Sequence, residues 1–567
     1  MNYKEEYEKW KKLDFLEPEL KKELKKIEND ETAIKNQFSY YVEFGTAGMR
    51  GTMGVGPNRM NFITIRRTTI GLAKFIKKNH AEKAGVAIIY DSRINSKEFA
   101  NYIAKTLTEF NIRVFISRDI RPTPFLSYAV LNMKTFAGIN ITASHNRKED
   151  NGYKIYLKNG AQFSSPDDKE IIKLVNEVTE KEMYVNPDDT KPNEKLISII
   201  PKEIEDGFLE NAVSHIIHKD FCKKNGKELK VVYTPLHGTG YTFLEEGFKK
   251  AGFTNVSVVK EQNDKCGEFK TVAYPNPESA AAFELALKLA KKKDADIVVA
   301  TDPDADRLGV YVKEKDGSYV ALTGNELASV IFEYILYFKK GLINYKNSMA
   351  AKSFVTTRLI DAIAERYGVE LKVTPTGFKW IGKMINESKK NFIFGCEESY
   401  GCLLSDYVRD KDAIGTTLLV LEIALALKRS NFTLYEMLKM LYNYYGVYKN
   451  YSFSITYEGV SGKEKMASMM KSLRDKPFTR LTDIDTLKVY DYATNEVLDM
   501  KSSKKEHFDF ITNDTVKFLM ADKTAITIRP SGTEPKIKIY FDIIDETDEL
   551  ADNKNKILES ALKKILV

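Results

Sequence analysis

Cysteine and tryptophan are scarce in this sequence: its 567 residues contain four cysteines and two tryptophans. The cysteines form no CxxC pair, so neither a disulfide framework nor a zinc site is indicated, and we expect reduced thiols. Long apolar segments are missing as well. The longest, residues 416–427, is interrupted by Glu422 and is too short to cross a bilayer, so it predicts a buried helix. The highly charged first ten residues do not resemble a secretory signal or a transit peptide, and we expect a cytoplasmic location.

A strong excess of one charge is also absent. Lys and Arg number 87 against 80 Asp and Glu, and the resulting formal charge of +7 is spread over the whole chain. Nucleic acid and membranes are therefore not implied as partners, whereas small anionic substrates fit. A hydrophobic fraction of 43% with 29% charged residues is typical of a globular protein, and the length predicts several domains instead of one core.

Strand and helix patterns alternate along most of the chain. Buried strands are predicted at residues 85–90 and 112–117, with a helix beginning at Asn95-Ser96 between them. The same strand, helix, strand order recurs within 229–259 and within 349–373. Three mixed α/β domains in series are therefore expected, with ligand-binding loops at the carboxyl ends of their strands.

The two ends of the chain differ from this pattern. The first forty residues are charged and predict mostly helix. From about residue 450 the strands are shorter and surround one helix near 463–473, which indicates a smaller α+β domain. The polar stretches 186–193 and 502–506 are the best candidates for loops or domain boundaries.

One serine stands among groups that could handle its proton, in Thr142-Ala143-Ser144-His145-Asn146 followed by Asn151-Gly152-Tyr153-Lys154. A hydroxyl alone is a poor nucleophile and needs a base, a lowered pKa or a metal. Lys154 and His145 are the candidates for proton transfer, and we favour Lys154 as general acid and base. A structural, hydrogen-bonded histidine explains His145 equally well.

Three carboxylates, Asp302, Asp304 and Asp306, follow the apolar strand predicted at 295–300. At separations of about 4 Å and an effective dielectric constant near 20, each like-charged pair would cost about 4 kcal/mol, so this loop calls for a cation. Carboxylate oxygens favour hard Mg²⁺.

Other interpretations of the acidic loop were weighed. An EF-hand would need Gly and Glu where Arg307 and Lys313 stand, so it is excluded. An aspartyl-phosphate enzyme using Asp302 as nucleophile and a solvated acidic turn both stay open.

Two further loops could bind a substrate. In residues 527–535 an arginine, two hydroxyls and a glycine form a phosphate-binding pattern, carried by Arg529, Ser531, Gly532 and Thr533. In residues 395–401, Glu397 and Ser399 offer groups that suit sugar hydroxyls. An ordinary polar turn would explain the first loop, and an acidic helix N-terminus would explain the second.

Together these motifs resemble the α-D-phosphohexomutase family, which includes phosphoglucomutases and phosphomannomutases. The resemblance runs nearly end to end and keeps the family's order of active-serine loop, metal loop, sugar-recognition loop and phosphate loop. It implies four domains with the active site in a central cleft. The expected boundaries are 1–206 for domain I with the N-terminal helical extension, 207–324 for domain II, 325–448 for domain III and 449–567 for the α+β domain IV.

The resemblance also implies an activity. Ser144 would carry a phosphoryl group and donate it to a hexose monophosphate, while Asp302, Asp304 and Asp306 hold Mg²⁺ together with a phosphoserine oxygen. A sugar bisphosphate such as glucose 1,6-bisphosphate would form, reorient and return its other phosphate to Ser144. The expected partner is a small sugar phosphate, with glucose preferred over mannose, and both a monomer and a dimer stay open.

Other residues are assigned by the same resemblance. The flanking cations are Arg50, Arg307 and Lys154. The loop with Thr376, Gly377 and Lys379 resembles the family loop that senses which face of the sugar is presented, although an exposed lysine without such a role would also explain Lys379. Weaker candidates are Arg93 and Arg409, for bracing the cleft, and His237, for supporting the metal loop, where a structural histidine is the alternative.

One position departs from the family pattern, and two functions compete with the hexomutase. The family's serine loop usually continues with proline, whereas this chain has Arg147, which either loosens the loop or reaches a substrate phosphate. A phosphopentomutase would have the same serine and metal loops. A non-catalytic protein that binds sugar phosphate and Mg²⁺ would have the same fold without turnover.

Overall fold

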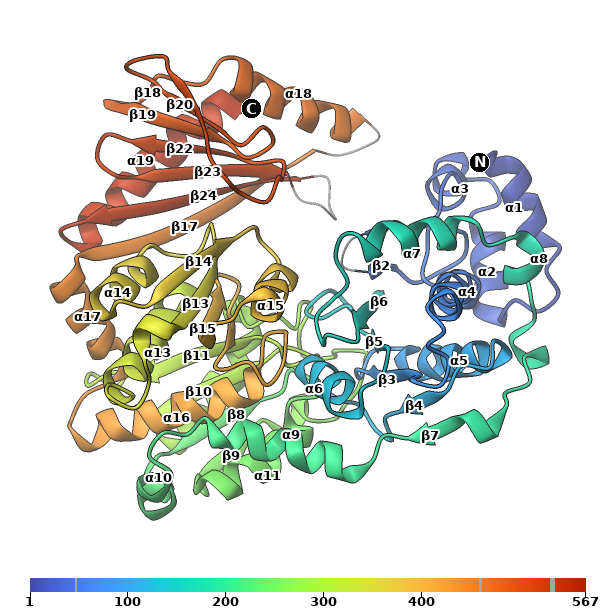
Figure 1. The fold of residues 1–567 in the computed structure, drawn as a ribbon, viewed down its shortest axis with the longest axis horizontal. Helices are drawn as coiled ribbons and strands as arrows, with labels where there is room; N and C mark the ends of the chain where they lie inside the picture. Colours follow the sequence, from blue (N-terminus) through green and yellow to red (C-terminus); the bar gives the residue numbers. More distant parts are fainter. Residues whose placement is uncertain (46–47, 458–460, 531–535, 567) are drawn as a thin grey trace. The chain divides into compact units, whose positions relative to one another are not determined.

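A computed structural model describes residues 1–45, 48–457, 461–530 and 536–566 (Figure 1). The chain forms two compact units. The first consists of Met1–Gly324, Ile381–Gly395 and Ser399–Thr433, and the second of Asn325–Trp380, Cys396–Glu398 and Leu434–Val567. Each unit is described separately below.

The first unit begins with three helices, α1 (Tyr3–Lys11), α2 (Pro18–Lys26) and α3 (Glu31–Phe38), which confirms the helical start. These helices bury an apolar cluster around Trp10, Phe38 and Ile63. Ile63 belongs to α4 (Phe62–Lys78), the long helix that follows, so the extension packs on the first α/β domain. A capping box formed by Asn61 and Thr64 begins α4 and satisfies main-chain N–H groups at its start.

A seven-stranded sheet forms the centre of the first α/β domain (Figure 1). Its order is β1-β2-β6-β5-β3-β4-β7. Strands β5, β3, β4 and β7 run parallel to one another, whereas each neighbouring pair from β5 through β6 and β2 to β1 is antiparallel. The strands are β1 (Phe44–Gly45), β2 (Gly48–Thr52), β3 (Val86–Tyr90), β4 (Val114–Ile116), β5 (Ala137–Ile141), β6 (Asp150–Leu157) and β7 (Ile197–Ile199). The strands predicted at 85–90 and 112–117 are confirmed as β3 and β4.

Helices accompany this sheet, as the alternating pattern predicts. They are α5 (Ser96–Glu109), α6 (Thr123–Met133), α7 (Asp167–Asn176) and α8 (Glu180–Met183). Helix α5 begins after Asn95, as expected, and both α5 and α6 contact β3. All five residues of β3 and of β5 are buried, and both strands are apolar except for Asn140 in β5, whose side chain donates to Thr123 Oγ1.

The second α/β domain has a five-stranded sheet of order β12-β11-β10-β8-β9. Strands β10, β8 and β9 are parallel, and β11 and β12 are antiparallel. The strands are β8 (Val231–Thr234), β9 (Val256–Val258), β10 (Ile297–Thr301), β11 (Leu308–Lys313) and β12 (Tyr319–Leu322); the helices are α9 (Lys202–Ser214), α10 (Lys219–Asn225), α11 (Tyr241–Ala251) and α12 (Glu284–Lys293). The fully buried β10 ends immediately before Asp302, so the sheet itself fixes the start of the acidic loop.

The apolar run 416–427 lies within α16 (Ala413–Arg429), which also belongs to the first unit and is buried along most of its length. Its one buried carboxylate, Glu422, accepts hydrogen bonds from the main-chain N–H groups of Ile217 and His218. The interruption of the apolar run is therefore satisfied by the turn that leads into α10. Within the described ranges, none of the helices has the length and apolar character that a bilayer crossing requires.

The third α/β segment supplies β13 (Ser348–Ser353), β14 (Glu370–Thr374), β15 (Asn391–Glu397), β16 (Gly401–Leu403), α13 (Gly324–Phe338), α14 (Leu359–Tyr367), α15 (Phe378–Glu387) and α17 (Leu434–Tyr445). Strands β13 and β14 pair in parallel, and α14 connects them, which confirms the predicted unit within 349–373.

The C-terminal domain in the second unit is an antiparallel sheet of order β17-β24-β23-β22-β19-β20-β21, with β18 paired to β19. Its elements are β17 (Val447–Thr456), α18 (Ser461–Asp475), β18 (Arg480–Leu481), β19 (Ile484–Asp491), β20 (Glu496–Asp499), β21 (Lys505–His507), β22 (Val516–Met520), β23 (Ala525–Pro530), β24 (Lys536–Asp545) and α19 (Asp548–Leu566). The polar stretch 502–506 is a turn plus the start of β21, so it is a hairpin loop and not a domain boundary. The expected fold, three mixed α/β domains and a smaller C-terminal α+β domain, is confirmed.

Candidate active site

The loop that carries Ser144 joins β5 to β6. Ser144 is buried, with 3% of its surface exposed, and its φ of 53° lies in the left-handed region, which costs a non-glycine residue about 1–2 kcal/mol. Its N–H donates to Thr142 Oγ1 at 2.8 Å. The loop also folds back onto Gly152, where a Cβ would lie 2.4 Å from the carbonyl oxygen of Thr142. Glycine at 152 is therefore required for this conformation.

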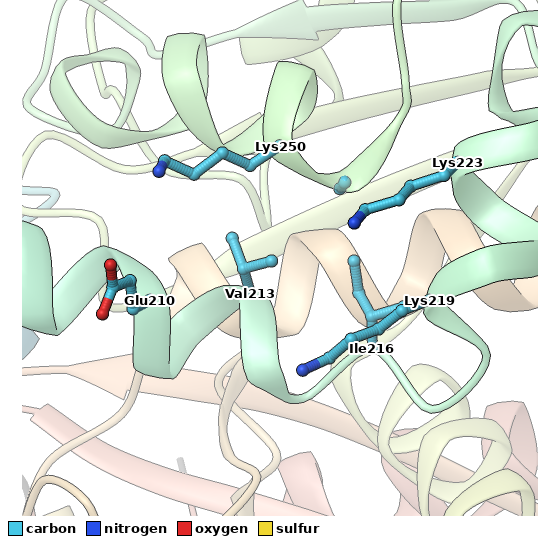
Figure 2. Close-up of a pocket in the computed structure, with 7 residues that line it drawn as sticks. Glu210, Val213, Ile216, Lys219, Lys223 and Lys250 are labelled. Atoms are coloured by element: carbon cyan, nitrogen blue, oxygen red, sulfur yellow. The ribbon is translucent and has the colours of Figure 1, made fainter.

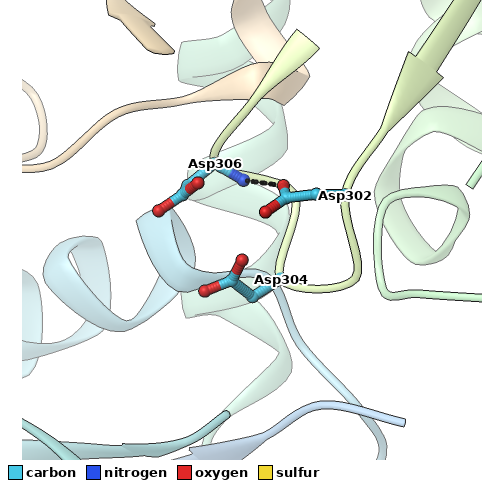
Figure 3. Close-up of side chains that lie close together, drawn as sticks. All are labelled: Asp302, Asp304 and Asp306. Atoms are coloured by element: carbon cyan, nitrogen blue, oxygen red, sulfur yellow. Dashed lines mark hydrogen bonds between the residues drawn. The ribbon is translucent and has the colours of Figure 1, made fainter. Parts of the chain in front are cut away.

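The acidic loop meets the serine directly. Ser144 Oγ donates to Asp302 Oδ2 at 2.9 Å, and the other oxygen of Asp302 accepts from the N–H groups of Asp306 and Arg307 at 3.1 Å each. Figure 3 shows the Asp302, Asp304 and Asp306 carboxylates gathered at this loop, with the bond from Asp306 N to Asp302 drawn. A nucleophile and three carboxylates from two different α/β domains thus form one cluster.

The pKa values of the three carboxyls shift in different directions. Burial, together with the neighbouring Asp304 and Asp306, raises the pKa of Asp302 well above its usual value. Burial also disfavours the charged form of Asp304, but the Lys154 ammonium and the hydrogen bonds with Asp302, Lys154 and Thr123 together outweigh it and lower the pKa of Asp304. Burial and Asp304 raise the pKa of Asp306. The charged forms of Asp302 and Asp306 are thus disfavoured in this buried cluster, and a bound cation would favour those forms.

The arrangement fits a metal ion in position and in free ligand atoms. One potential ligand atom from each aspartate lies within 4.8 Å of the others. Across 1–45, 48–457, 461–530 and 536–566, Asp304 Oδ1 and Asp306 Oδ1 are buried without a hydrogen-bond partner. Buried carboxylate oxygens without partners are costly unless they bind a cation, and oxygen ligands suit Mg²⁺.

Lys154 lies at this cluster. It projects from β6, is buried, and its Nζ donates to Asp304 Oδ2 at 2.7 Å while lying 3.9 Å from Asp306 Oδ2. Thr123, the first residue of α6, donates its hydroxyl to the same Asp304 oxygen at 2.7 Å and its N–H to the Asp304 carbonyl. Asp304 is therefore oriented by groups from the first domain.

The other predicted cations and His145 surround the serine loop. Arg50 donates to Asn146 Oδ1 at 3.3 Å, and Arg307 forms an ion pair with Glu278. His145 Nδ1 lies 3.1 Å from Ser144 Oγ. Burial and the adjacent Arg307 and Arg50 lower the pKa of His145 well below its usual value. His145 is thus a neutral imidazole at pH 7 and can exchange a hydrogen bond with the serine hydroxyl.

The predicted substrate residues lie mostly in the second unit. Gly377 has a φ of +108°, and its N–H donates to Glu397 Oε1 at 2.6 Å, so the Thr376–Lys379 loop is joined to the sugar-recognition loop. Lys379 Nζ lies 4.9 Å from the Trp380 ring centroid. Ser399 belongs to the first unit and is half-buried.

The phosphate loop is described only at its start. Arg529, at the end of β23, donates to the Tyr540 hydroxyl at 3.4 Å. The predicted phosphate ligands Ser531, Gly532 and Thr533 lie outside the described residues.

Sequence reasoning missed two residues at the acidic cluster, Thr123 and Lys411. Lys411 Nζ lies 3.2 Å from Asp306 Oδ2 and 3.1 Å from Asp410 Oδ1. The signal for Lys411 was the charged run 409–412, from which Arg409 was chosen; Arg409 instead bonds to Asn386. Nothing in the sequence around Thr123 indicates its role.

His237 pairs with Asp264 and Thr271, and its neighbour Thr239 bonds to the Pro303 carbonyl of the acidic loop, so this segment does contact the loop.

Arg147→Pro tests whether position 147 only shapes the serine loop. The Arg147 side chain is exposed and lines a hollow of about 570 Å³ with residues 268–273, and its carbonyl accepts from Arg93. Proline keeps that carbonyl and adds rigidity. We expect turnover within about threefold of the parent, measured as kcat at saturating substrate. A collapse in kcat would show that the arginine side chain itself takes part.

Another cavity of the first unit contains none of the predicted site residues. It measures about 340 Å³ and is lined by parts of α9, α10 and α11, with Lys219, Lys223 and Lys250 extending around Val213 and Ile216 (Figure 2). Its lining includes Glu210 as its single carboxylate and no serine, threonine or cysteine.

Profiles of a protein family match the chain in four consecutive segments. They are described as Phosphoglucomutase/phosphomannomutase alpha/beta/alpha domain I at residues 41–182, domain II at 206–317, domain III at 323–445 and C-terminal domain at 480–560. The order is that of the four predicted domains, whose individual boundaries stay a prediction.

Curated relatives and solved structures agree with the profiles. The chain is 34% identical to a phosphoglucomutase of Staphylococcus aureus (strain MRSA252), over 92% of this chain and 93% of the relative. It is 33% identical to a phosphoglucomutase of Staphylococcus epidermidis, over 96% and 98%. Its fold is similar to pp63/parafusin, a phosphoglucomutase from Paramecium in an open form, with a TM-score of 0.67, 20% identity and coverage of 92% and 93%. Its fold is also similar to a phosphoglucomutase/phosphomannomutase family protein from Burkholderia thailandensis, with a TM-score of 0.64, 18% identity, and coverage of 91% of this chain and 96% of that one.

Proposed function

Because this chain belongs to the phosphoglucomutase/phosphomannomutase family, we propose that it interconverts hexose 1-phosphate and hexose 6-phosphate, with glucose phosphates as the preferred pair. The observation that supports this most directly is the hydrogen bond from Ser144 Oγ to Asp302 within a buried cluster of three carboxylates. A phosphoserine at that position would stand beside a cation site, which is what phosphoryl transfer requires.

We propose that Asp302, Asp304 and Asp306 hold Mg²⁺ at this cluster. The bound ion would supply neutralisation of the charge on the phosphoserine and on the transferring phosphoryl group. Arg50 and Arg307, which lie at the serine loop and the acidic loop, would add positive charge at the rim. The residues themselves would orient the phosphoserine, because Ser144 is fixed on one side by Thr142 and on the other by Asp302.

The proposed reaction has two balanced transfers. The phosphoryl group leaves Ser144 Oγ and bonds to a free sugar hydroxyl, whose proton passes to the base; the serine oxygen is left as the leaving group and regains a proton. The sugar is now a bisphosphate, glucose 1,6-bisphosphate for glucose. After it reorients, its other phosphoryl group bonds to Ser144 Oγ, whose proton passes to the base, and the sugar oxygen that loses the group regains a proton. The product monophosphate then leaves.

Lys154 is the base and acid of this proposal. Its Nζ lies 2.7 Å from Asp304, at the serine cluster. As an ammonium it would give a proton to the departing serine oxygen, and as the resulting amine it would take the proton of the sugar hydroxyl. His145 is assigned a supporting role because its neutral imidazole contacts the serine oxygen rather than an open position.

The second unit and Ser399 would recognise the sugar phosphate. Glu397 and Ser399 would bind neighbouring sugar hydroxyls, while Thr376, Gly377 and Lys379 would sense the face presented. Arg529, Ser531, Gly532 and Thr533 would hold the phosphate that is not reacting. Arginine suits that role because its fork binds phosphate in a bidentate manner.

A cytoplasmic location is part of the proposal, and a sequence with four cysteines and no CxxC pair supports it.

Substrate preference is tested by a coupled assay over glucose, mannose, glucosamine and ribose 1-phosphates. The proposal expects the highest kcat/KM with glucose 1-phosphate. The highest value with ribose 1-phosphate would identify a phosphopentomutase. No turnover of any of the four, combined with tight binding, would identify the non-catalytic sugar-phosphate protein.

Lys154→Met should lower kcat by about 10²-fold, because a positioned proton-transfer group contributes about that much or more. Methionine keeps the length of the buried side chain but removes the ammonium. Lys158→Met is the matched control, since Lys158 follows β6 at an exposed position. Equal kcat in Lys154→Met and in the control would remove Lys154 from the mechanism.

A further inference from the structure

We propose that Arg93 is the positioning residue that fixes the serine loop for phosphoryl transfer, an inference that rests on the proposed mutase function. Arg93 lies just after β3, and its side chain is fully buried. Its two terminal nitrogens donate to four main-chain carbonyls of one loop: Ser144 at 2.6 Å, Asn146 at 2.6 Å, Arg147 at 2.7 Å and Asp150 at 3.0 Å. One side chain therefore holds the whole turn that carries the nucleophile.

Arg93 is itself held from two sides. Its Nε lies 3.2 Å from Asp91 Oδ2, and the other oxygen of Asp91 accepts from the Arg93 N–H at 2.9 Å and from Ser96 Oγ at 2.8 Å. On the other side the guanidinium lies 4.9 Å from the ring centroid of Phe269. Asp91 belongs to the first α/β domain and Phe269 to the second, so Arg93 contacts both domains.

The segment that supplies Phe269 packs closely against Arg93 and the residues next to it, which together form a brace for the serine loop. A Cβ at Gly267 would lie 2.4 Å from the main-chain nitrogen of Ile94, so this position has room only for glycine. Lys265 and Glu268 of the same segment form ion pairs with Asp119 and Lys148 of the first domain. These contacts hold the segment against the first domain and keep the Phe269 ring over Arg93.

This brace is needed because of the serine's own conformation. Ser144 adopts a φ of 53°, a region that a non-glycine residue keeps only when its surroundings impose it. The Arg93 bonds go to carbonyls and leave Ser144 Oγ to meet Asp302. In-line transfer tolerates little displacement, and an error of about 1 Å can cost about 10²-fold in rate. Arg93 touches no reacting atom, so its role is positioning and not catalysis.

Lysine cannot replace this residue in function. Its ammonium is a point charge with three donors, whereas arginine presents five donors in a rigid planar fork. Arg93→Lys keeps the positive charge beside Asp91 but cannot span four carbonyls. The variant therefore separates charge from geometry.

The test compares full-length wild type, Arg93→Lys and Arg113→Lys with Mg²⁺ present. Arg113 is the matched control, because it is exposed and its guanidinium also lies over a ring, 4.7 Å from Phe115. Steady-state assays with glucose 1-phosphate give kcat and KM. Quenched-flow samples analysed by intact mass give the rate at which glucose 1,6-bisphosphate phosphorylates Ser144. We expect Arg93→Lys to lose about 10²-fold in kcat and in phosphorylation rate, with KM changed less than about threefold. Arg113→Lys should match wild type.

The melting temperature distinguishes positioning from folding. A folded Arg93→Lys with wild-type kcat, or a loss of kcat equal to the fraction unfolded, would overturn the proposal. If Arg93→Lys does not fold, Phe269→Leu decides: a kcat reduced about threefold or more supports the brace, and a kcat within twofold of wild type overturns it. Failure of wild type to form phosphoserine would refute the mutase function itself, so the two failures are distinguishable.

Discussion

Ser144→Ala is expected to lower kcat by at least about 10⁴-fold and to abolish the phosphate adduct on the enzyme. Removing the nucleophile of a covalent mechanism costs this much because the remaining residues can only bind the substrate. The change should cost little stability. Ser144 Oγ contacts Asp302, whose raised pKa indicates that its charge is poorly compensated, and the loop is held by main-chain bonds that alanine keeps.

The measurement is intact mass after incubation with glucose 1,6-bisphosphate and Mg²⁺, together with the coupled mutase assay. Ser214→Ala is the matched control, because Ser214 is exposed and only bonds to the Asn211 carbonyl of its own helix. An adduct that persists in Ser144→Ala would locate the phosphate elsewhere. If that adduct were labile to hydroxylamine, Asp302 would be the nucleophile and the enzyme an aspartyl-phosphate enzyme.

The fold could be predicted from the sequence where local patterns decide it. The buried strand β3, the start of α5 at Asn95 and the strand, helix, strand order within 349–373 all follow from apolar runs and helix-start signals. The order of strands in each sheet was not accessible in this way. Strand β6 inserts between β2 and β5, and β4 pairs with β7 some 80 residues later, because tertiary packing and not local pattern selects those neighbours.

The candidate site divides along the same line. Ser144, the three aspartates and Lys154 were accessible because their chemistry is written in short motifs. Thr123 and Lys411 were not, since each acts on an aspartate far away in the chain, and only the fold brings them within hydrogen-bond distance. The brace at Arg93 shows the same limit: the sequence places an arginine near the end of a strand but cannot show that it faces four carbonyls of a loop 50 residues on.

Asp302→Asn is expected to lower kcat by about 10³-fold while leaving the metal-free protein as stable as the parent or more stable. The loss of activity follows from the loss of a metal ligand and of the carboxylate that contacts Ser144. The effect on stability follows from the pKa. A carboxyl whose pKa is raised by folding makes its full contribution to the free energy of unfolding at pH values below its unfolded pKa. That contribution is lost as the pH rises through the folded pKa. Without metal, wild type should therefore lose stability from about pH 4 upward, and Asp302→Asn should lose less.

Two melting curves, with EDTA and with saturating Mg²⁺, check this expectation. Saturation at about 100 times Kd should stabilise wild type by about 2.7 kcal/mol, and Asp302→Asn should show little of that gain. The amide oxygen introduced by Asp302→Asn can still accept from the N–H groups of Asp306 and Arg307, so the loop should keep its shape. A variant that binds Mg²⁺ as tightly as wild type would remove Asp302 from the metal site.

Asp304→Asn gives the contrast that makes the result specific. The pKa of Asp304 is lowered because the Lys154 ammonium and the hydrogen bonds at this carboxyl together offset the penalty of burial. Asp304→Asn therefore removes the close ion pair of the buried Lys154 and leaves it with Asp306 at 3.9 Å. Breaking such a pair costs about 3–5 kcal/mol. Both variants should lose Mg²⁺ binding, but only Asp304→Asn should melt well below wild type in EDTA. If both variants destabilise the metal-free protein equally, the charge is distributed evenly over the cluster, and the assignment of Asp302 as its uncompensated member is wrong.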